Sequence, residues 1–286
     1  MKELKRIAAI HDISGVGKCS LTVALPVISA SGVECACLPT ALLSTHTGGF
    51  KDFTFKDLSE EMLPIARHWK AEGIEFDGIY SGYLASAKQE ETLEEIIKIL
   101  ASPTTKIIVD PVMADNGSYY SKLGHEMCLA FRRLCGKADI ITPNITEAAL
   151  LADLPYREGP HDEEYLSSLV DGLRDICSGI IAITGVRPNS DSVGVYALDS
   201  KTGESCLCVR KARQGVFCGT GDIFASSFAA LMLRGASLKD AAEIAISLVG
   251  ESIDRTVERG TPRRNGVDFE GALPSYIRQI SELFGE

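Results

Sequence analysis

The segment Gly219-Thr220-Gly221-Asp222 combines residue types that suit phosphoryl transfer. Glycines let backbone N–H groups approach a ligand closely, and the apolar residues that follow predict a helix whose first N–H groups would bind an anion. A carboxylate would repel that anion, but it could accept a proton from a nucleophile that attacks it. We therefore interpret Asp222 as a general base beside an anion hole. In a simpler interpretation, Asp222 only caps the helix, which ends at Gly235.

The composition is that of a globular protein. The 286 residues are 45% hydrophobic and 24% charged and contain no low-complexity linker, which favours a single domain over 1–286. No apolar run approaches the roughly 18 residues that span a bilayer. The first apolar run ends at His11-Asp12, which is too short for a signal peptide. We expect no membrane insertion and a cytoplasmic protein.

Charge and cysteine content narrow the possible partners. A net charge of −10 argues against nucleic-acid binding, which needs basic patches. An anionic substrate must then be held by local N–H groups and a metal ion. The nine cysteines include no Cys-x-x-Cys pair, so we interpret them as reduced, small core residues.

Short apolar runs alternate with helical segments along the chain. We expect strands at 6–11, 33–39, 76–81, 106–110, 139–142 and 180–184, and helices from about 19, with a kink or interruption near Pro26, and at 56–72 and 87–101. The runs 192–198 and 205–210 flank a turn and predict an edge hairpin, and the last third is helical. The fold class is therefore α/β: a three-layer α/β/α sandwich with a mostly parallel sheet and an antiparallel edge hairpin.

Polar residues gather in the loops that follow the predicted strands. Ligands of open α/β sheets bind beyond the carboxyl ends of the strands, so these loops favour a common site. Each loop is a weak signal alone, because a lone histidine is usually a core residue and Thr-Pro-Asn usually a turn. The loops carry His11, Asp12 and Ser14; the segment 44–49; Tyr80 to Tyr83; Asp110 to Met113; Thr142 to Glu147; and Thr184-Gly185.

The segment 15–20, Gly-Val-Gly-Lys-Cys-Ser, resembles the end of a P-loop. A P-loop needs a glycine five residues before its Gly-Lys pair and a hydroxyl directly after the lysine. Asp12 and Cys19 occupy those positions here, so the phosphate cradle and the magnesium ligand would both be missing. We interpret Lys18 as a solvated residue near a helix start.

Four blocks in one order resemble the ribokinase-like superfamily, and within it the pyridoxal kinase family. The resemblance runs from about Ile7 to the C-terminal helix. The blocks are Gly219-Thr220-Gly221-Asp222, Val109-Asp110-Pro111-Val112-Met113, Ala138-Asp139-Ile140-Ile141-Thr142-Pro143-Asn144-x-x-Glu147 and Ser44-x-His46-Thr47-Gly48.

The resemblance implies a role for each matching residue. Asp222 would be the base, with Gly219, Thr220 and Gly221 as the anion hole. Asp110 and Glu147 would hold Mg²⁺ beside the triphosphate of ATP, since hard cations prefer carboxylate oxygens. Residues on the phosphate side of the nucleotide would be Asp110, Thr142, Asn144, Glu147, Thr184, Gly219 and Gly221, and residues on the acceptor side would be Asp12, Ser14, His46, Thr47, Gly48, Tyr83 and Asp222.

The implied activity is ATP-dependent phosphorylation of the 5′-hydroxymethyl group of a vitamin B6 vitamer by a homodimer, with a monovalent cation as an optional helper. Many pyridoxal kinases carry Ser-His where this chain has His11-Asp12. The preferred vitamer among pyridoxal, pyridoxamine and pyridoxine therefore stays open.

Two alternatives remain. Hydroxymethylpyrimidine kinase is a sister activity, although that branch commonly resembles Gly-Thr-Gly-Cys rather than Gly-Thr-Gly-Asp. A non-catalytic ligand-binding member of the fold is the other, and the presence of the base, the glycines and both metal carboxylates argues against it.

Overall fold

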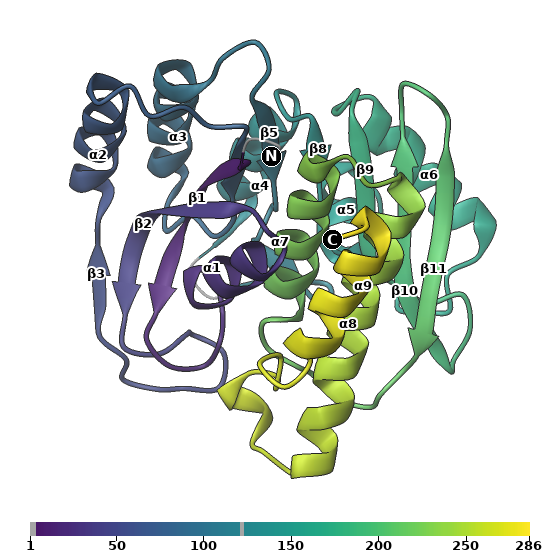
Figure 1. The fold of residues 1–286 in the computed structure, drawn as a ribbon. Coiled ribbons are helices and arrows are strands. Elements are labelled where there is room, and N and C mark those ends of the chain that lie inside the picture. Colours follow the sequence, from purple (N-terminus) through teal and green to yellow (C-terminus); the bar gives the residue numbers. More distant parts are fainter. Residues whose placement is uncertain (1–3, 121–122) are drawn as a thin grey trace.

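A computed structural model describes residues 4–120 and 123–286 and shows a nine-stranded sheet between two layers of helices (Figure 1). The strand order is β11-β10-β9-β8-β5-β4-β1-β2-β3. The adjacent strands β2, β1, β4, β5, β8 and β9 run parallel to one another. At the edges, β3 is antiparallel to β2, β10 is antiparallel to β9, and β11 is antiparallel to β10. The bounds are β1 (Arg6–Ser14), β2 (Glu34–Leu43), β3 (Phe55–Asp57), β4 (Gly78–Ser81), β5 (Lys106–Val109), β8 (Ile140–Ile141), β9 (Ile180–Val186), β10 (Ser192–Asp199) and β11 (Ser205–Lys211).

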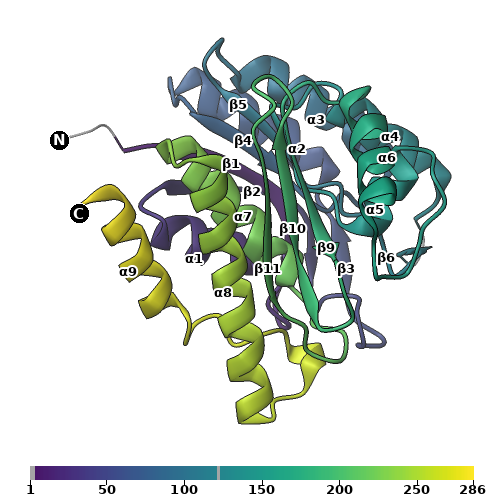
Figure 2. The same ribbon diagram turned by 90° about the vertical axis from the view of Figure 1, so that its right-hand side faces the viewer.

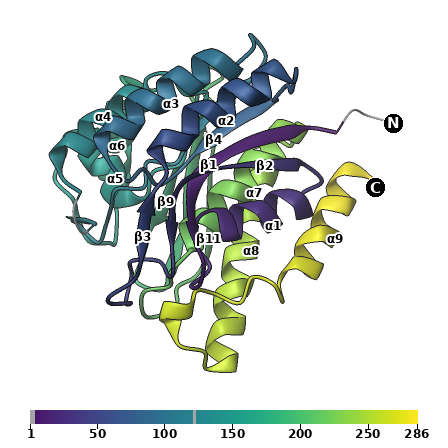
Figure 3. The same ribbon diagram turned by 90° about the vertical axis from the view of Figure 1, so that its left-hand side faces the viewer.

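Helices cover both faces of this sheet, as the two side views show (Figures 2 and 3). One layer contains α1 (Leu21–Ala30), α7 (Thr220–Arg234), α8 (Leu238–Arg259) and α9 (Leu273–Phe284). The other contains α2 (Ser59–Ala71), α3 (Ala87–Leu100), α4 (His125–Cys135), α5 (Ile145–Leu151) and α6 (Glu163–Arg174). The predicted three-layer α/β fold is confirmed, with the antiparallel hairpin at one edge.

The strands read as continuous apolar runs because the sheet is buried on both sides. On β1, Ile7 and Ala9 pack toward α1 and α7, whereas Ala8 and Ile10 pack toward the opposite helices. Alternating side chains thus enter two separate cores. No helix in the described ranges is both long and apolar enough to cross a bilayer.

The structure differs from the sequence prediction at short elements. The helix expected from residue 56 starts at Ser59, because Phe55–Asp57 forms β3 on the edge of β2. A second small sheet, β6 (Ala114–Asp115) with β7 (Ser118–Tyr119), was not predicted, because two-residue strands leave no periodic pattern. The helix α1 runs through Pro26 as one element. Between α8 and α9 lies the short 3₁₀ helix η1 (Arg263–Asn265).

Candidate active site

The start of α7 forms the centre of the site. Gly219 is the N-cap residue and has a left-handed backbone (φ 82°). A Cβ there would lie 2.1 Å from the carbonyl oxygen of Lys18, so only glycine fits. Asp222 is the third residue of the helix, and the N-cap position belongs to Gly219. The interpretation of Asp222 as the N-cap is therefore wrong.

The surroundings of Asp222 favour its protonated form. The side chain is partly buried, and desolvation raises its pKa to about 7. The nearby carboxylate of Asp12 adds to this rise, whereas the backbone N–H of Ser20 opposes it. A base with a pKa near neutrality is well matched to proton transfer at physiological pH.

Further carboxyl groups lie beside Asp222. Asp110 follows β5 and is buried, and burial together with Glu147 and Asp222 raises its pKa well above the usual value. Neither Asp12, Asp110, Glu147 nor Asp222 forms an ion pair with a lysine or arginine in the part of the chain that the structure describes. The site therefore crowds carboxyl groups whose ionised forms an added cation would stabilise.

Glu147 and Asn144 act first as a structural pair. The Asn144 side chain accepts hydrogen bonds from the backbone N–H groups of Thr146 and Glu147, and Glu147 Oε2 accepts one from the N–H of Asn144 (2.9 Å). Glu147 Oε1 also accepts the N–H of Met113 at 3.0 Å. Burial raises the pKa of Glu147 to about 8, while these N–H donors oppose the rise. The pair fixes the loop after β5 against α5.

Two threonines complete the predicted nucleotide side. The hydroxyl of Thr142 is buried near Asp110, and its interaction with that carboxyl group opposes the rise of the Asp110 pKa. Thr184 pairs with Asn144 through a backbone bridge between β9 and the start of α5. The loops after β5 and β8 thus converge, whereas Thr184 reaches them from within β9 (Ile180–Val186) and not from the loop after it, as the sequence predicted.

Asp12 is the centre of the predicted acceptor side. It is buried, and its two oxygens accept hydrogen bonds from the hydroxyls of Ser14 (2.9 Å) and Ser20 (2.5 Å). Burial raises its pKa, and the hydrogen bonds from Ser20 and Ser14 oppose the rise, with His46 also close by. Tyr83 lies close enough that the Asp12 charge, after burial, raises the pKa of the phenol. The structure therefore brings Asp12, Ser14, His46 and Tyr83 together.

His46 is held in one orientation by its loop. The N–H of Gly48 donates to Nδ1 (2.9 Å), so Nε2 carries the proton and donates to the carbonyl of Arg264 (2.6 Å). The ring leaves no room for a side chain at Gly17, where a Cβ would lie 1.9 Å from it. Thr47 and Gly48 are exposed on the same loop.

His11 faces away from solvent. Its ring is fully buried, contacts the ring of Tyr80 edge-on at 4.3 Å, and has no hydrogen-bond partner for either nitrogen among the described residues. Burial lowers its pKa to about 3, so the ring is neutral. His11 is thus a buried, neutral residue of β1 that packs against Tyr80.

A cavity of about 530 Å³ leads to the start of α7. Its walls include Thr220, Phe217, Arg187, Lys211, Ile246 and Gly250. Of these, only Thr220 was predicted from the sequence, because the others come from separate elements without a local motif. The one available signal was the basic run Lys211-Ala-Arg213 in an acidic chain. The cavity combines apolar walls with cations, which suits an anionic ligand that has an apolar part.

Two cysteines at the site were expected in the core. Cys19 lies beside Gly219, and Cys218 lies against Gly48. Both are partly exposed, although burial raises the pKa of each thiol. All nine cysteines are free thiols, but only Cys128, Cys135, Cys177 and Cys208 are fully buried. The predicted placement in the core is correct for only these four.

The segment 15–20 is not a P-loop, as predicted. The amine of Lys18 bonds to Glu270 (2.7 Å) and to the carbonyl of Val267 (3.1 Å), in the segment that leads to α9. Its side chain is 33% exposed. The interpretation of Lys18 as a solvated residue is therefore wrong, because it is an anchor for the C-terminal segment.

Comparisons with known proteins agree with this geometry. The family model described as phosphomethylpyrimidine kinase matches residues 23–266. A putative phosphomethylpyrimidine kinase from Bacteroides thetaiotaomicron, solved with pyridoxal, is 36% identical with a TM-score of 0.90, covering 96% of each chain. Pyridoxal kinase from Lactobacillus plantarum is 30% identical with a TM-score of 0.88, covering 98% of this chain and 99% of that one.

A plant enzyme is also similar. The chloroplastic thiamine biosynthetic bifunctional enzyme TH1 of Arabidopsis thaliana is 29% identical over 247 residues, which cover 84% of this chain. The match spans 45% of the length of that enzyme. From the matched family model, the fold and these relatives, we conclude that the chain belongs to the phosphomethylpyrimidine kinase family of the ribokinase-like superfamily and is a kinase.

Proposed function

We propose that this kinase transfers the γ-phosphoryl group of ATP to the 5′-hydroxymethyl group of a vitamin B6 vitamer. The observation that carries the proposal is the position of Asp222. It lies at the start of α7, next to the buried group around Asp12 on one side and two residues from Thr220 in the cavity wall on the other. A base in this position is adjacent to both an acceptor site and a donor site.

The proposed reaction uses the residues as follows. The acceptor hydroxyl oxygen attacks the γ-phosphorus, Asp222 takes the hydroxyl proton, and the bond from the γ-phosphorus to the bridging oxygen breaks to release ADP. The N–H groups at the start of α7, at Gly219, Thr220 and Gly221, stabilise charge on the transferring group. The apolar and cationic cavity walls hold the rest of the nucleotide.

The residues present fit a magnesium ion that takes most of its ligands from the triphosphate and water. No group of three acidic, histidine or cysteine side chains in the described ranges could hold a metal alone. Asp110 supplies a buried carboxyl group close to Glu147 and Asp222, and the hydroxyl of Thr142 lies beside it. We propose Asp110 as a direct ligand and Glu147 as the residue that orients its loop. The ion would neutralise the triphosphate beside these carboxyl groups.

Hydroxymethylpyrimidine kinase is the second candidate. The matched family model and the plant thiamine enzyme favour it. A structure of a relative solved with pyridoxal, and the several curated pyridoxal kinases that resemble this chain, favour a B6 vitamer. Asp222 serves as the base in either reaction, so the acceptor side decides between them.

We further propose that the chain acts as a single-domain, cytoplasmic enzyme and as a homodimer. The nine free cysteines suit a reducing compartment. Both core clusters pack against one continuous sheet. The exposed apolar side chains Leu25, Leu42 and Phe55, on α1, β2 and β3, are candidates for a subunit contact.

An acceptor panel tests the function. Pyridoxal, pyridoxamine, pyridoxine and hydroxymethylpyrimidine should each be assayed with ATP and Mg²⁺, with and without a chelator. We expect at least one B6 vitamer to have the highest kcat/KM, and chelation to abolish turnover. A much higher kcat/KM for hydroxymethylpyrimidine would establish the second candidate, and full activity after chelation would refute the magnesium site.

A further inference from the structure

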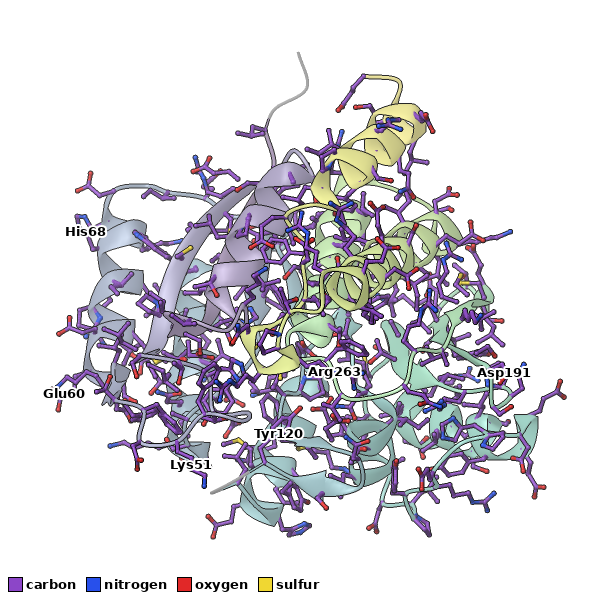
Figure 4. All side chains as sticks on the ribbon, turned by 90° about the horizontal axis from the view of Figure 1, so that it is seen from below. Lys51, Glu60, His68, Tyr120, Asp191 and Arg263 are labelled. Carbon is purple, nitrogen blue, oxygen red and sulfur yellow. The ribbon has the colours of Figure 1, made fainter. Side chains whose placement is uncertain are left out.

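The segment between α8 and α9 (residues 260–272, the α8–α9 segment) contacts three loops of the site. A Cβ on Gly266 would lie 2.3 Å from the carbonyl oxygen of Gly17, in the loop after β1. Val267 and Glu270 receive the amine of Lys18 from the same loop. The helix η1 lies in this segment and contacts two more loops, the one that follows β2 and the one that precedes α7. Figure 4 views the site from this end, with Arg263 near its middle.

Arg263 contacts the loop that precedes α7 (residues 212–219, the donor loop). Its guanidinium lies 4.8 Å from the centre of the Phe217 ring. A Cβ on Gly215 would lie 1.3 Å from Arg263 Nη1, so the arginine occupies the space that a side chain there would need. Gly215 and Phe217 also form part of the wall of the 530 Å³ cavity. Arg263 therefore supports the outside of that wall.

Arg264 contacts the loop that follows β2 (residues 44–54, the acceptor loop). Its guanidinium lies 5.4 Å from the centre of the Phe50 ring, and its carbonyl accepts the proton of His46 Nε2 at 2.6 Å. Phe50 packs edge-on against His46 at 5.0 Å between ring centres. Arg264 thus holds both the backbone position and the aromatic contact of the acceptor loop.

The two arginines are adjacent in sequence and serve different loops. Neither forms an ion pair in the described ranges, so their main side-chain contacts are with the aromatic rings. A planar guanidinium stacks on such rings better than a lysine amine does. Both arginines lie in the single short turn of η1. We therefore expect a displacement of the Arg263 backbone to displace the backbone of Arg264 as well.

We propose that Arg263 and Arg264 are positioning residues that couple the donor loop to the acceptor loop, so that nucleotide binding orders the acceptor loop before the acceptor arrives. The inference rests on the proposed function, because it takes the cavity as the nucleotide site. Binding at Phe217 would fix Arg263, η1 would fix Arg264, and Arg264 would fix His46 and Phe50. The expected consequence is that ATP and acceptor bind with positive coupling.

Hydrogen exchange tests the coupling without an acceptor. The full chain is measured with and without Mg²⁺ and the non-hydrolysable ATP analogue AMPPNP, and peptides from both loops are compared. In the wild type we expect AMPPNP to slow exchange in both loops, by about fivefold or more in the acceptor loop. In Arg264→Ala, the donor loop should still be protected while the acceptor loop is not. Arg263→Ala should give the same loss in the acceptor loop.

Matched variants separate coupling from simple destabilisation. Arg263→Lys and Arg264→Lys keep the charge and should lose much of the coupling, because the planar contact is gone. Arg278→Ala removes an exposed arginine from α9 and should leave the coupling unchanged. Melting temperatures report whether a variant is folded at the temperature of measurement.

Each outcome bears on a different claim. Protection of the donor loop alone in the wild type, or undiminished protection of the acceptor loop in both alanine variants, would overturn the coupling and leave the proposed function intact. No protection by AMPPNP in either loop would overturn both. Equal loss of acceptor-loop protection in Arg278→Ala would show that the effect is not specific to η1.

Discussion

Ser20 connects Asp12 to Asp222. Its hydroxyl donates a 2.5 Å hydrogen bond to the Asp12 carboxylate, and its backbone N–H favours the charged form of Asp222. One residue therefore supports the proposed base and the main polar group of the acceptor side. Ser20 thus joins the two carboxyl groups. Four predictions follow from the arrangement of these and the neighbouring residues.

Asp222→Asn should lower kcat roughly 10² to 10⁴-fold while leaving nucleotide affinity unchanged or slightly higher. The amide keeps the size of the side chain but cannot take the proton, and it removes a negative charge beside the γ-phosphate. Steady-state kinetics and AMPPNP titration measure the two effects. Met232→Leu, a change near the opposite end of the same helix, is the control. A near-wild-type kcat in Asp222→Asn would remove it as the base.

The pH dependence should follow the raised pKa of Asp222. Since a base must be deprotonated to act, kcat/KM should rise with pH and level off above a midpoint near 7. The free energy of unfolding should fall as pH rises. The pKa of Asp222 is higher in the folded chain than in the unfolded chain, so the stability that its protonation contributes is complete at low pH and is lost as pH rises through about 7.

Asp222→Asn also tests the stability part of this prediction, because it removes the titration. Its melting temperature should exceed that of the wild type at about pH 8 and approach it at about pH 4. A wild-type midpoint below about 5 for kcat/KM would mean that the carboxyl is not desolvated in the working enzyme.

Asp12→Asn should raise the KM of the acceptor by about tenfold or more, with a smaller change in kcat. The buried carboxylate has hydroxyl donors but no cationic partner in the described residues, so it favours an acceptor that presents an N–H group or a positive charge. The loss should be largest for pyridoxamine. Ser14→Ala removes one donor and keeps the charge, and it should have the smaller effect. Equal losses for all vitamers would show that Asp12 does not select among them.

Lys18→Ala should reduce kcat less than about fivefold, because the amine serves Glu270 rather than a phosphate. The ion pair is partly exposed, so the loss of stability should stay near or below about 1 kcal/mol. Glu270→Ala removes the other partner and should reproduce both effects. A loss of kcat in Lys18→Ala as large as that in Asp222→Asn would show that the amine reaches the phosphates.

The sequence predicted the parts of the site that lie on continuous segments. The Gly219 to Asp222 turn is readable because its chemistry is local. The capping pair Asn144 and Glu147 was not predicted, because both residues were assigned to the nucleotide and Glu147 also to the metal ion. The contacts of Arg263, Arg264 and Phe217 could not be predicted, since they join segments far apart in the chain and follow no periodic pattern. The role of Ser20 was missed because a serine before a helix usually signals a cap, whereas here its side chain makes no capping bond.

The packing of the first helix has a consequence for biosynthesis. The apolar side of α1 is covered by α7 and α9, and the hydroxyl of Tyr276 in α9 bonds to Ser31 at 2.6 Å (Figure 1). A chain emerging from the ribosome therefore leaves part of the apolar side of α1, with Leu21, Val27 and Ile28, uncovered until α9 has been made. The nascent protein must remain protected from aggregation until then, and a chain that lacks α9 would leave that surface open.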